Sequence, residues 1–159
     1  MKHNEQSLFP LSPTFTKQAT VFGFPEAVGT VNGSITEDTK GVITITKQAG
    51  SVADVAIALN TAGVNTGETF SMEVDVLLNG TSCLTTKAKI DYTSGEASQQ
   101  RSTAISGESE TNTDAIVDTT ANTFAENTIV SFEADITRTS TPQTEMEGLC
   151  VFVKFEPFL

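Results

Sequence analysis

The sequence has few of the residue types on which catalytic and metal sites most often depend. Its 159 residues include no Trp, one Tyr, one His and two Cys. The single histidine, His3, lies near the N-terminus, so we expect no His-based acid–base catalysis, no Ser-His-Asp triad and no His-rich metal site. The cysteines, Cys83 and Cys150, are too few for a disulfide scaffold and too isolated for a zinc site. The sequence therefore predicts neither an enzyme nor a cofactor- or metal-binding protein.

Positive charge and long apolar runs are also scarce. Nine Lys and Arg stand against twenty Asp and Glu, which gives a formal net charge of −11. A chain this acidic is repelled by nucleic acid and by anionic membranes, so we expect neither as a partner. No run approaches the ~18 apolar residues of a membrane span, and the N-terminus lacks the apolar core of a signal peptide. We expect synthesis in a cytosol, with the acidity serving either solubility or docking onto a basic protein surface.

Thr and Ser are plentiful and supply about a quarter of the chain, while ten Phe provide most of the aromatic side chains. This composition favours strands and turns over helices. The segment 70–78 alternates strictly, with Phe70, Met72, Val74, Val76 and Leu78 on one face and the polar residues on the other. Asn79-Gly80 follows it, and Asn-Gly between two such runs is the strongest short-range hairpin signal.

Further strands of the same kind follow along the chain. We expect them at residues 19–24 (closed by Pro25), 41–46, 52–60, 84–90, 115–118, 128–136 and 148–155, with a weak strand near 102–105 inside a polar excursion. Roughly eight strands at this spacing predict one antiparallel β-sandwich or barrel. We place this single domain at residues 19–159.

Residues 1–18 differ from the rest and predict an extended N-terminal arm. Pro10 and Pro13 pre-stiffen the segment in an extended form, which lowers the entropy lost on docking. The apolar residues around them have no regular period. We therefore predict that the arm binds a partner, through Leu8, Phe9, Pro10, Leu11, Pro13 and Phe15. The alternative is a flexible terminus without a role.

Carboxylates recur at the polar positions of two predicted strands: Glu73 and Asp75 in one, Glu133 and Asp135 in the other. Acid–base catalysis needs a cleft that gives two carboxyl groups different environments. These four occupy regular solvent-facing positions, so we interpret them as a solvated sheet face. A Ca²⁺ ion held by such oxygen ligands is left open.

The last strand carries an apolar residue on its polar face. Val151 and its alternate neighbours define the core face, whereas Phe152 lies on the other face beside Cys150. Ile129 breaks the polar alternation of its own strand in the same way. Because exposed apolar area is usually hidden in a partner, we predict self-association with Ile129 and Phe152 at a subunit interface. We interpret the cysteines as buried small residues, with a Cys83–Cys150 disulfide as the alternative.

The order of these features resembles a known group of proteins. An alternating strand, the Asn79-Gly80-Thr81 turn, a polar excursion, the strand 128–136 and the Gly-Leu-x-Val-x-Val-x-Phe ending at 148–155 are similar to small jelly-roll modules of tailed-phage virions. The resemblance covers about residues 50–159. It implies a jelly-roll-like sandwich, a place on the capsid surface after synthesis in the host cytoplasm, and trimers.

On this basis we interpret the chain as a virion structural protein, a capsid decoration or cement protein that binds the major capsid protein or another virion protein. The alternative is a receptor- or glycan-binding module of a head fibre or tail. A cement protein needs its arm ordered on a partner, whereas a binding tip needs a specific exposed groove.

Overall fold

The computed structural model describes residues 26–35, 39–61, 69–93, 100–101, 112–138 and 146–158, and across them it forms strands and turns without a helix. The strands are β1 (Glu26–Ile35), β2 (Thr39–Ile45), β3 (Gly50–Thr61), β4 (Thr69–Leu78), β5 (Thr81–Ser82), β6 (Leu84–Thr86), β7 (Ala88–Thr93), β8 (Gln100–Arg101), β9 (Ile116–Val117), β10 (Thr123–Phe124), β11 (Ile129–Arg138) and β12 (Met146–Pro157). All strand pairs are antiparallel, so the predicted all-β antiparallel fold is confirmed. In this part of the chain nothing forms a helix long and apolar enough to cross a membrane.

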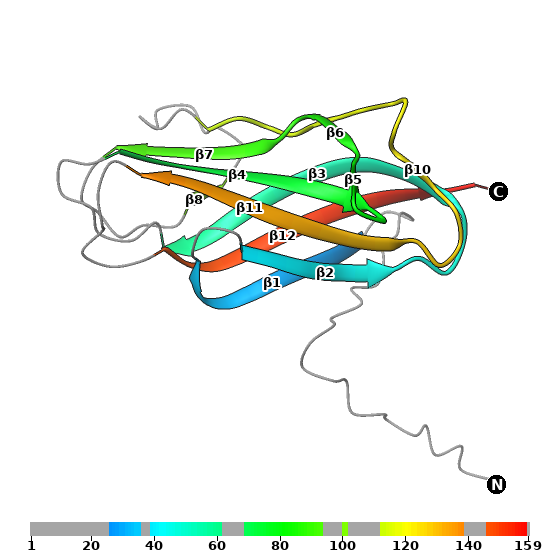
Figure 1. The fold of residues 1–159 in the computed structure, drawn as a ribbon, viewed down its shortest axis with the longest axis horizontal. Coiled ribbons are helices and arrows are strands. Elements are labelled where there is room, and N and C mark those ends of the chain that lie inside the picture. Colours follow the sequence, from blue (N-terminus) through cyan, green and yellow to red (C-terminus); the bar gives the residue numbers. More distant parts are fainter. Residues whose placement is uncertain are drawn as a thin grey trace, which may run out of the picture.

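Two five-stranded sheets face each other, as Figure 1 shows. Sheet A has the order β1-β12-β3-β10, with β8 also paired to β3. Sheet B has the order β2-β11-β4-β5, with β7 also paired to β4, and β6 pairs with β9 in a short ribbon. In sheet A β12 lies between β1 and β3, and in sheet B β11 lies between β2 and β4. The last two long strands thus complete sheets that the first four begin.

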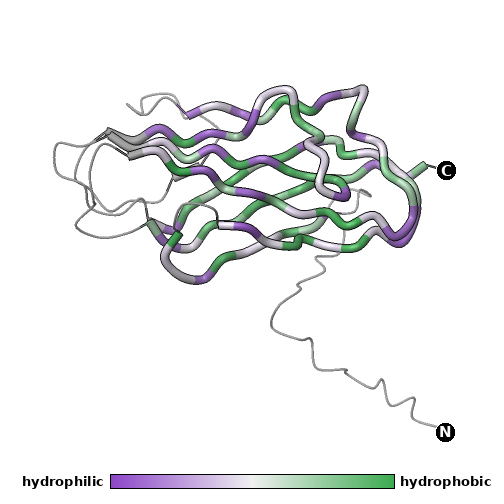
Figure 2. The backbone as a smooth tube through the Cα atoms, viewed as in Figure 1, coloured by the Kyte–Doolittle hydropathy of each residue, from purple (hydrophilic) through white to green (hydrophobic). Residues whose placement is uncertain are grey.

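The core lies between the sheets and consists of the inward residues of each strand. Hydrophobic and hydrophilic positions alternate along the strands in Figure 2, which is the period-2 pattern of a sandwich. In β4 the residues Met72, Val74 and Val76 are fully buried, as predicted. Phe132 in β11 and Val151 in β12 are buried as well, at 1% and 0% exposure. The predicted core faces of these three strands are therefore confirmed.

The Asn79-Gly80 turn has the predicted geometry. The φ angles of Asn79 and Gly80 are 49° and 84°, the positive values that a type I′ turn requires at both central residues. The Asn79 N–H also donates to the Ile129 carbonyl at 2.9 Å, and its Oδ1 accepts from the Ile129 N–H at 2.9 Å. The turn therefore holds the first residue of β11 as well as joining β4 to β5.

Two glycines leave room for the largest fully buried side chain. Phe132 lies opposite Gly41 in the pairing of β11 with β2. A Cβ atom at Gly41 would lie 2.5 Å from Phe132 Cε1, and one at Gly29 would lie 3.1 Å from that atom and 2.9 Å from Ile43 Cγ1. The ring covers the bare backbone of the edge strand, as aromatic residues opposite glycine do in other sheets. β1 and β2 can therefore both approach Phe132.

Some predicted boundaries differ from the structure. The expected strand 84–90 is divided at Lys87 into β6 and β7, because β6 leaves β4 and pairs with β9. The expected strand 115–118 is only Ile116–Val117 long. The predicted arm, the strand 19–24 and the weak strand 102–105 lie outside the described residues, and the arm and the jelly-roll topology remain predictions.

Candidate interaction surfaces

The attachment residues predicted for the arm cannot be placed. Leu8, Phe9, Pro10, Leu11, Pro13 and Phe15 all precede Glu26, the first described residue. Their role remains a prediction.

Phe152 lies on the outer face of sheet A, pointing away from the core. Its side chain is 43% exposed, and its cross-strand neighbours are Val28 in β1 and Ala56 in β3. A shallow hollow of about 130 Å³ beside the ring is lined by Glu26, Asp54, Ala56, Phe152, Val153 and Lys154. We call Val28, Ala56 and Phe152 the A patch.

Ile129 lies on the outer face of sheet B. It is 45% exposed and lies directly opposite Ile45, which is 47% exposed. Val42, which is 55% exposed, lies on the same outer face and pairs with Ser131. A β-bulge between the pairs Thr44–Val130 and Val42–Ser131 leaves Ile43 as an extra residue of β2, and Ile43 faces the core. We call Val42, Ile45 and Ile129 the B patch.

The A and B patches lie on opposite outer faces of the sandwich. Val151 and Val153, which flank Phe152 in sheet A, are buried between the sheets, so Phe152 points outward from sheet A. Val130, which follows Ile129 in sheet B, is also buried between the sheets, so Ile129 points outward from sheet B. A single protomer therefore cannot present Phe152 and Ile129 in one continuous surface. Any contact that uses both residues must join two different faces of two molecules, which is a heterologous interface.

The four carboxylates identified in the sequence lie in neighbouring strands, β4 and β11. Glu133 is opposite Asp75, and Asp135 is opposite Glu73. Lysines lie among them: the Lys40 Nζ is 3.0 Å from Glu133 Oε1, the Lys87 Nζ is 3.8 Å from Asp75 Oδ2, and the Lys89 Nζ is 3.0 Å from Asp91 Oδ2. This outer face of sheet B is therefore a mixed-charge surface in which ion pairs offset like-charge repulsion.

Asp75 does not fit the prediction of a solvated face, because it is only 9% exposed. The β4–β5 hairpin places Ser82 over it, and the Ser82 Oγ donates to Asp75 Oδ1 at 2.7 Å. The buried carboxylate thus has a hydroxyl donor and a nearby lysine. Among the described residues no group of three or more His, Cys, Asp or Glu could hold a metal ion.

Both cysteines are free thiols in the structure, so the alternative of a Cys83–Cys150 disulfide is not found. Cys83 is fully buried as predicted, whereas Cys150 is only half-buried in β12. Burial, together with the nearby Asp75 carboxylate, raises the pKa of Cys83 from 9.0 to about 12. Burial also raises the pKa of Cys150.

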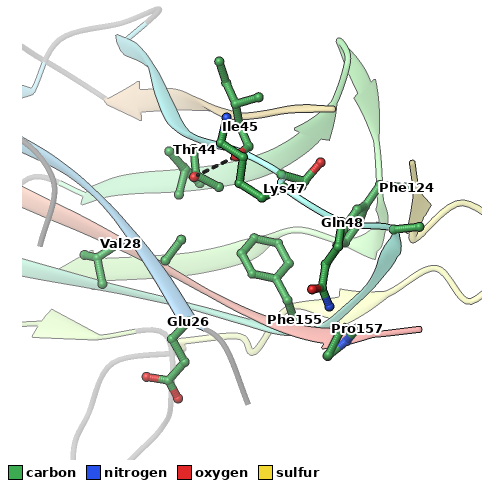
Figure 3. A pocket seen from close by; sticks show the side chains of 13 residues that line it. Glu26, Val28, Thr44, Ile45, Lys47, Gln48, Phe124, Phe155 and Pro157 are labelled. Carbon is green, nitrogen blue, oxygen red and sulfur yellow. Dashed lines mark hydrogen bonds between the residues drawn. The ribbon is translucent and has the colours of Figure 1, made fainter. Parts of the chain in front are cut away.

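An open groove of about 460 Å³ lies where the two sheets meet at the start of β1 and the end of β2 (Figure 3). In Figure 3 the Phe155 ring points into it, between Val28 on one side and Phe124 and Gln48 on the other. Phe124 packs edge-on against Phe155, with ring centroids 5.4 Å apart. The lining is mainly apolar and consists of Glu26, Ala27, Val28, Ile43, Thr44, Ile45, Thr46, Lys47, Gln48, Ala49, Phe124, Phe155 and Pro157.

Hydrogen bonds hold one wall of this groove in place. The Thr46 Oγ1 donates to the Ala125 carbonyl at 2.8 Å and accepts from the Thr128 N–H at 3.0 Å. The Asn127 N–H donates to the Thr46 carbonyl at 2.8 Å. The sequence could not reveal this groove, because its residues come from four separate parts of the chain that only the tertiary structure brings together.

Comparisons with protein-family models, with curated proteins and with solved structures find no significant match.

Proposed function

We propose that this chain is a virion structural protein of a tailed phage, which decorates or cements the capsid by binding the major capsid protein. The observation that carries the proposal is the pair of apolar patches on opposite faces of a small, acidic sandwich. A protein that bridges neighbours on a shell needs contact surfaces on more than one side, and exposed apolar patches are typical of protein contacts.

The strand order supports the same proposal. The chain passes from sheet A to sheet B between β1 and β2 and again between β3 and β4, and it returns from β11 in sheet B to β12 in sheet A. β11 and β12 are each paired between two earlier strands, and we propose that this nested order belongs to a jelly roll built from Greek keys. Jelly rolls are common in viral capsid proteins.

In this proposal residues 1–18 anchor the protein to the capsid, and the patches contact neighbouring copies or capsid subunits. Apolar side chains near Pro10 and Pro13 provide the anchor, because proline reduces the chain entropy lost on binding. The net charge of −11 favours a basic region of the capsid surface over nucleic acid.

The test is co-sedimentation of the protein with capsids of the cognate phage. The full chain should bind, and deletion of residues 1–18 should abolish or strongly weaken binding while the circular dichroism spectrum keeps its β form. A matched variant in which only Pro10 and Pro13 are replaced by Ala should bind more weakly than the full chain. Full occupancy by the truncated protein would show that the arm is not the anchor.

A cryo-EM map of the intact particle provides the second test. Density for this sandwich on the capsid surface would support the cement role. Density at the tip of a head fibre or tail would instead favour the receptor- or glycan-binding alternative.

A further inference from the structure

The groove beside Phe155 exists because β12 is longer than its partner at this end. Glu26 is the first residue of β1 and pairs with Lys154. β12 continues through Pro157, and in the described strands its residues 155–157 pair only with β3, on the side away from β1. One strand position of sheet A is therefore unfilled at this end by the described residues, and Phe155 lines the groove beside it.

The opposite wall belongs to sheet B. The end of β2 and the loop 46–49 form it, and the contacts of Thr46 with Ala125 and Thr128 keep it in place. The groove is therefore a fixed opening between two sheet edges. Unpaired sheet edges readily accept a further strand.

The chain itself supplies a segment that suits this opening. Residues 19–24, Ala-Thr-Val-Phe-Gly-Phe, carry no charge and have the composition of a strand. They end two residues before Glu26, which lines the groove. Six extended residues reach about 20 Å, and so short a tether gives an effective concentration in the millimolar range.

We propose that residues 19–24 of the same chain occupy this groove as an extended strand, covering Phe155 with the apolar side chains of Phe22 and Phe24, which share one face of such a strand. Pro25 separates the segment from β1, because proline interrupts a ladder by removing one N–H donor. The groove is then part of the sandwich, and the arm 1–18 leaves the domain from its rim. The proposal does not depend on the capsid role.

The first test uses the full chain. Phe22→Ser with Phe24→Ser should lower the denaturant midpoint and increase the fluorescence of bound 8-anilinonaphthalene-1-sulfonate several-fold, because the groove loses its apolar cover. The matched control, Phe9→Ser with Phe15→Ser, removes two phenylalanines from the arm and should change neither quantity. The proposal is overturned if the two double variants behave alike.

The second test separates the same chain from a second copy. Phe22→Cys is combined with Gln48→Cys, whose side chain is exposed at the groove rim, in a Cys150→Ser background. Under mild oxidation the protein should form an internal disulfide and migrate as a compact monomer on a non-reducing gel, whereas Phe9→Cys with Gln48→Cys should not. A disulfide-linked dimer would show strand exchange between copies and overturn the proposal, as would the absence of any cross-link. Neither test uses capsids, so its failure is distinguishable from failure of the proposed function.

Discussion

Phe132 shows how a single residue links the two sheets. It follows the alternation of β11 and is 1% exposed, and its ring fills the space left by Gly41 in β2 and Gly29 in β1. Its neighbour in the chain, Glu133, faces solvent and pairs with Lys40 at 3.0 Å, an exposed ion pair of small value. Adjacent residues of one strand therefore contribute very differently to the free energy of unfolding.

We expect Phe132→Ala to lower the free energy of unfolding by about 3–5 kcal/mol, because it removes a buried ring and leaves a cavity next to two glycines. Glu133→Ala should stay within about ±0.5 kcal/mol. Urea midpoints of the two variants measure the difference. Equal losses would mean that Phe132 and Glu133 do not lie on opposite faces of β11.

The two thiols should differ in reactivity. Cys83 is fully buried and its pKa is raised to about 12, so it is protonated at pH 8 and shielded, whereas Cys150 is half-buried. We expect a disulfide reagent to modify Cys150 in the folded protein and Cys83 only after denaturation. The Cys150→Ser variant serves as control and should show almost no reaction until it is unfolded; fast labelling of that variant would contradict the buried position of Cys83.

The raised pKa of Cys83 also predicts a dependence of stability on pH. The folded protein keeps the thiol protonated while the unfolded chain ionises near 9.0. The contribution of Cys83 to the free energy of unfolding is therefore fully present below pH 9 and is lost as the pH rises from about 9 towards 12. Comparison of urea midpoints over this range between the wild type and Cys83→Ala isolates it, since only the wild type should show this part of the decline.

At the scale of elements, turns and register determine which side chains meet. The Asn79-Gly80 turn sets the pairing of β4 with β5, and that pairing places Ser82 over Asp75. The same turn binds Ile129 at the start of β11 through two hydrogen bonds. A local sequence signal thus controls contacts in three strands.

Gly80→Ala should destabilise the protein by about 1–2 kcal/mol, because Gly80 has φ +84° and an L-residue is strained there. Gly33→Ala is the matched control, since a Cβ at Gly33 meets nothing within 4 Å and its φ is not positive. That control should be neutral or slightly stabilising. Thermal or urea unfolding compares the two, and equal behaviour would contradict the type I′ assignment.

At the scale of the whole molecule, the sandwich is closed by its last strands and carries apolar patches on both outer faces. Glu26, at the start of β1, pairs with Lys154 near the end of the chain. Pairings so distant in sequence are slow to form. The opposed patches mean that a closed ring of copies needs a heterologous interface, in which the A patch of one copy contacts the B patch of the next.

We predict a trimer of the 16.8 kDa chain in solution at micromolar concentration. Phe152→Lys and Ile129→Lys should each shift the mass measured by light scattering towards the monomer, because each places a charge in the apolar contact. Thr137→Lys, at an exposed position of β11, should leave the trimer intact. A wild-type monomer, both free and on the particle, would contradict the prediction.

The sequence by itself determined the long strands β3, β4, β11 and β12 and their inward faces. The alternation of β4 and β12 and the Asn79-Gly80 turn are local: side-chain period and positive φ depend on a few consecutive residues. The all-β fold and the buried positions of Phe132 and Val151 could therefore be predicted without the structure.

Only the tertiary structure decided which surfaces result from these strands. The burial of Asp75 depends on Ser82, the separation of Phe152 and Ile129 depends on which sheet each strand joins, and the groove depends on β12 extending past Glu26. These are pairings between segments far apart in the chain. A strand's own pattern specifies which face is apolar but not which neighbour lies beside it, so long-range register had to be observed.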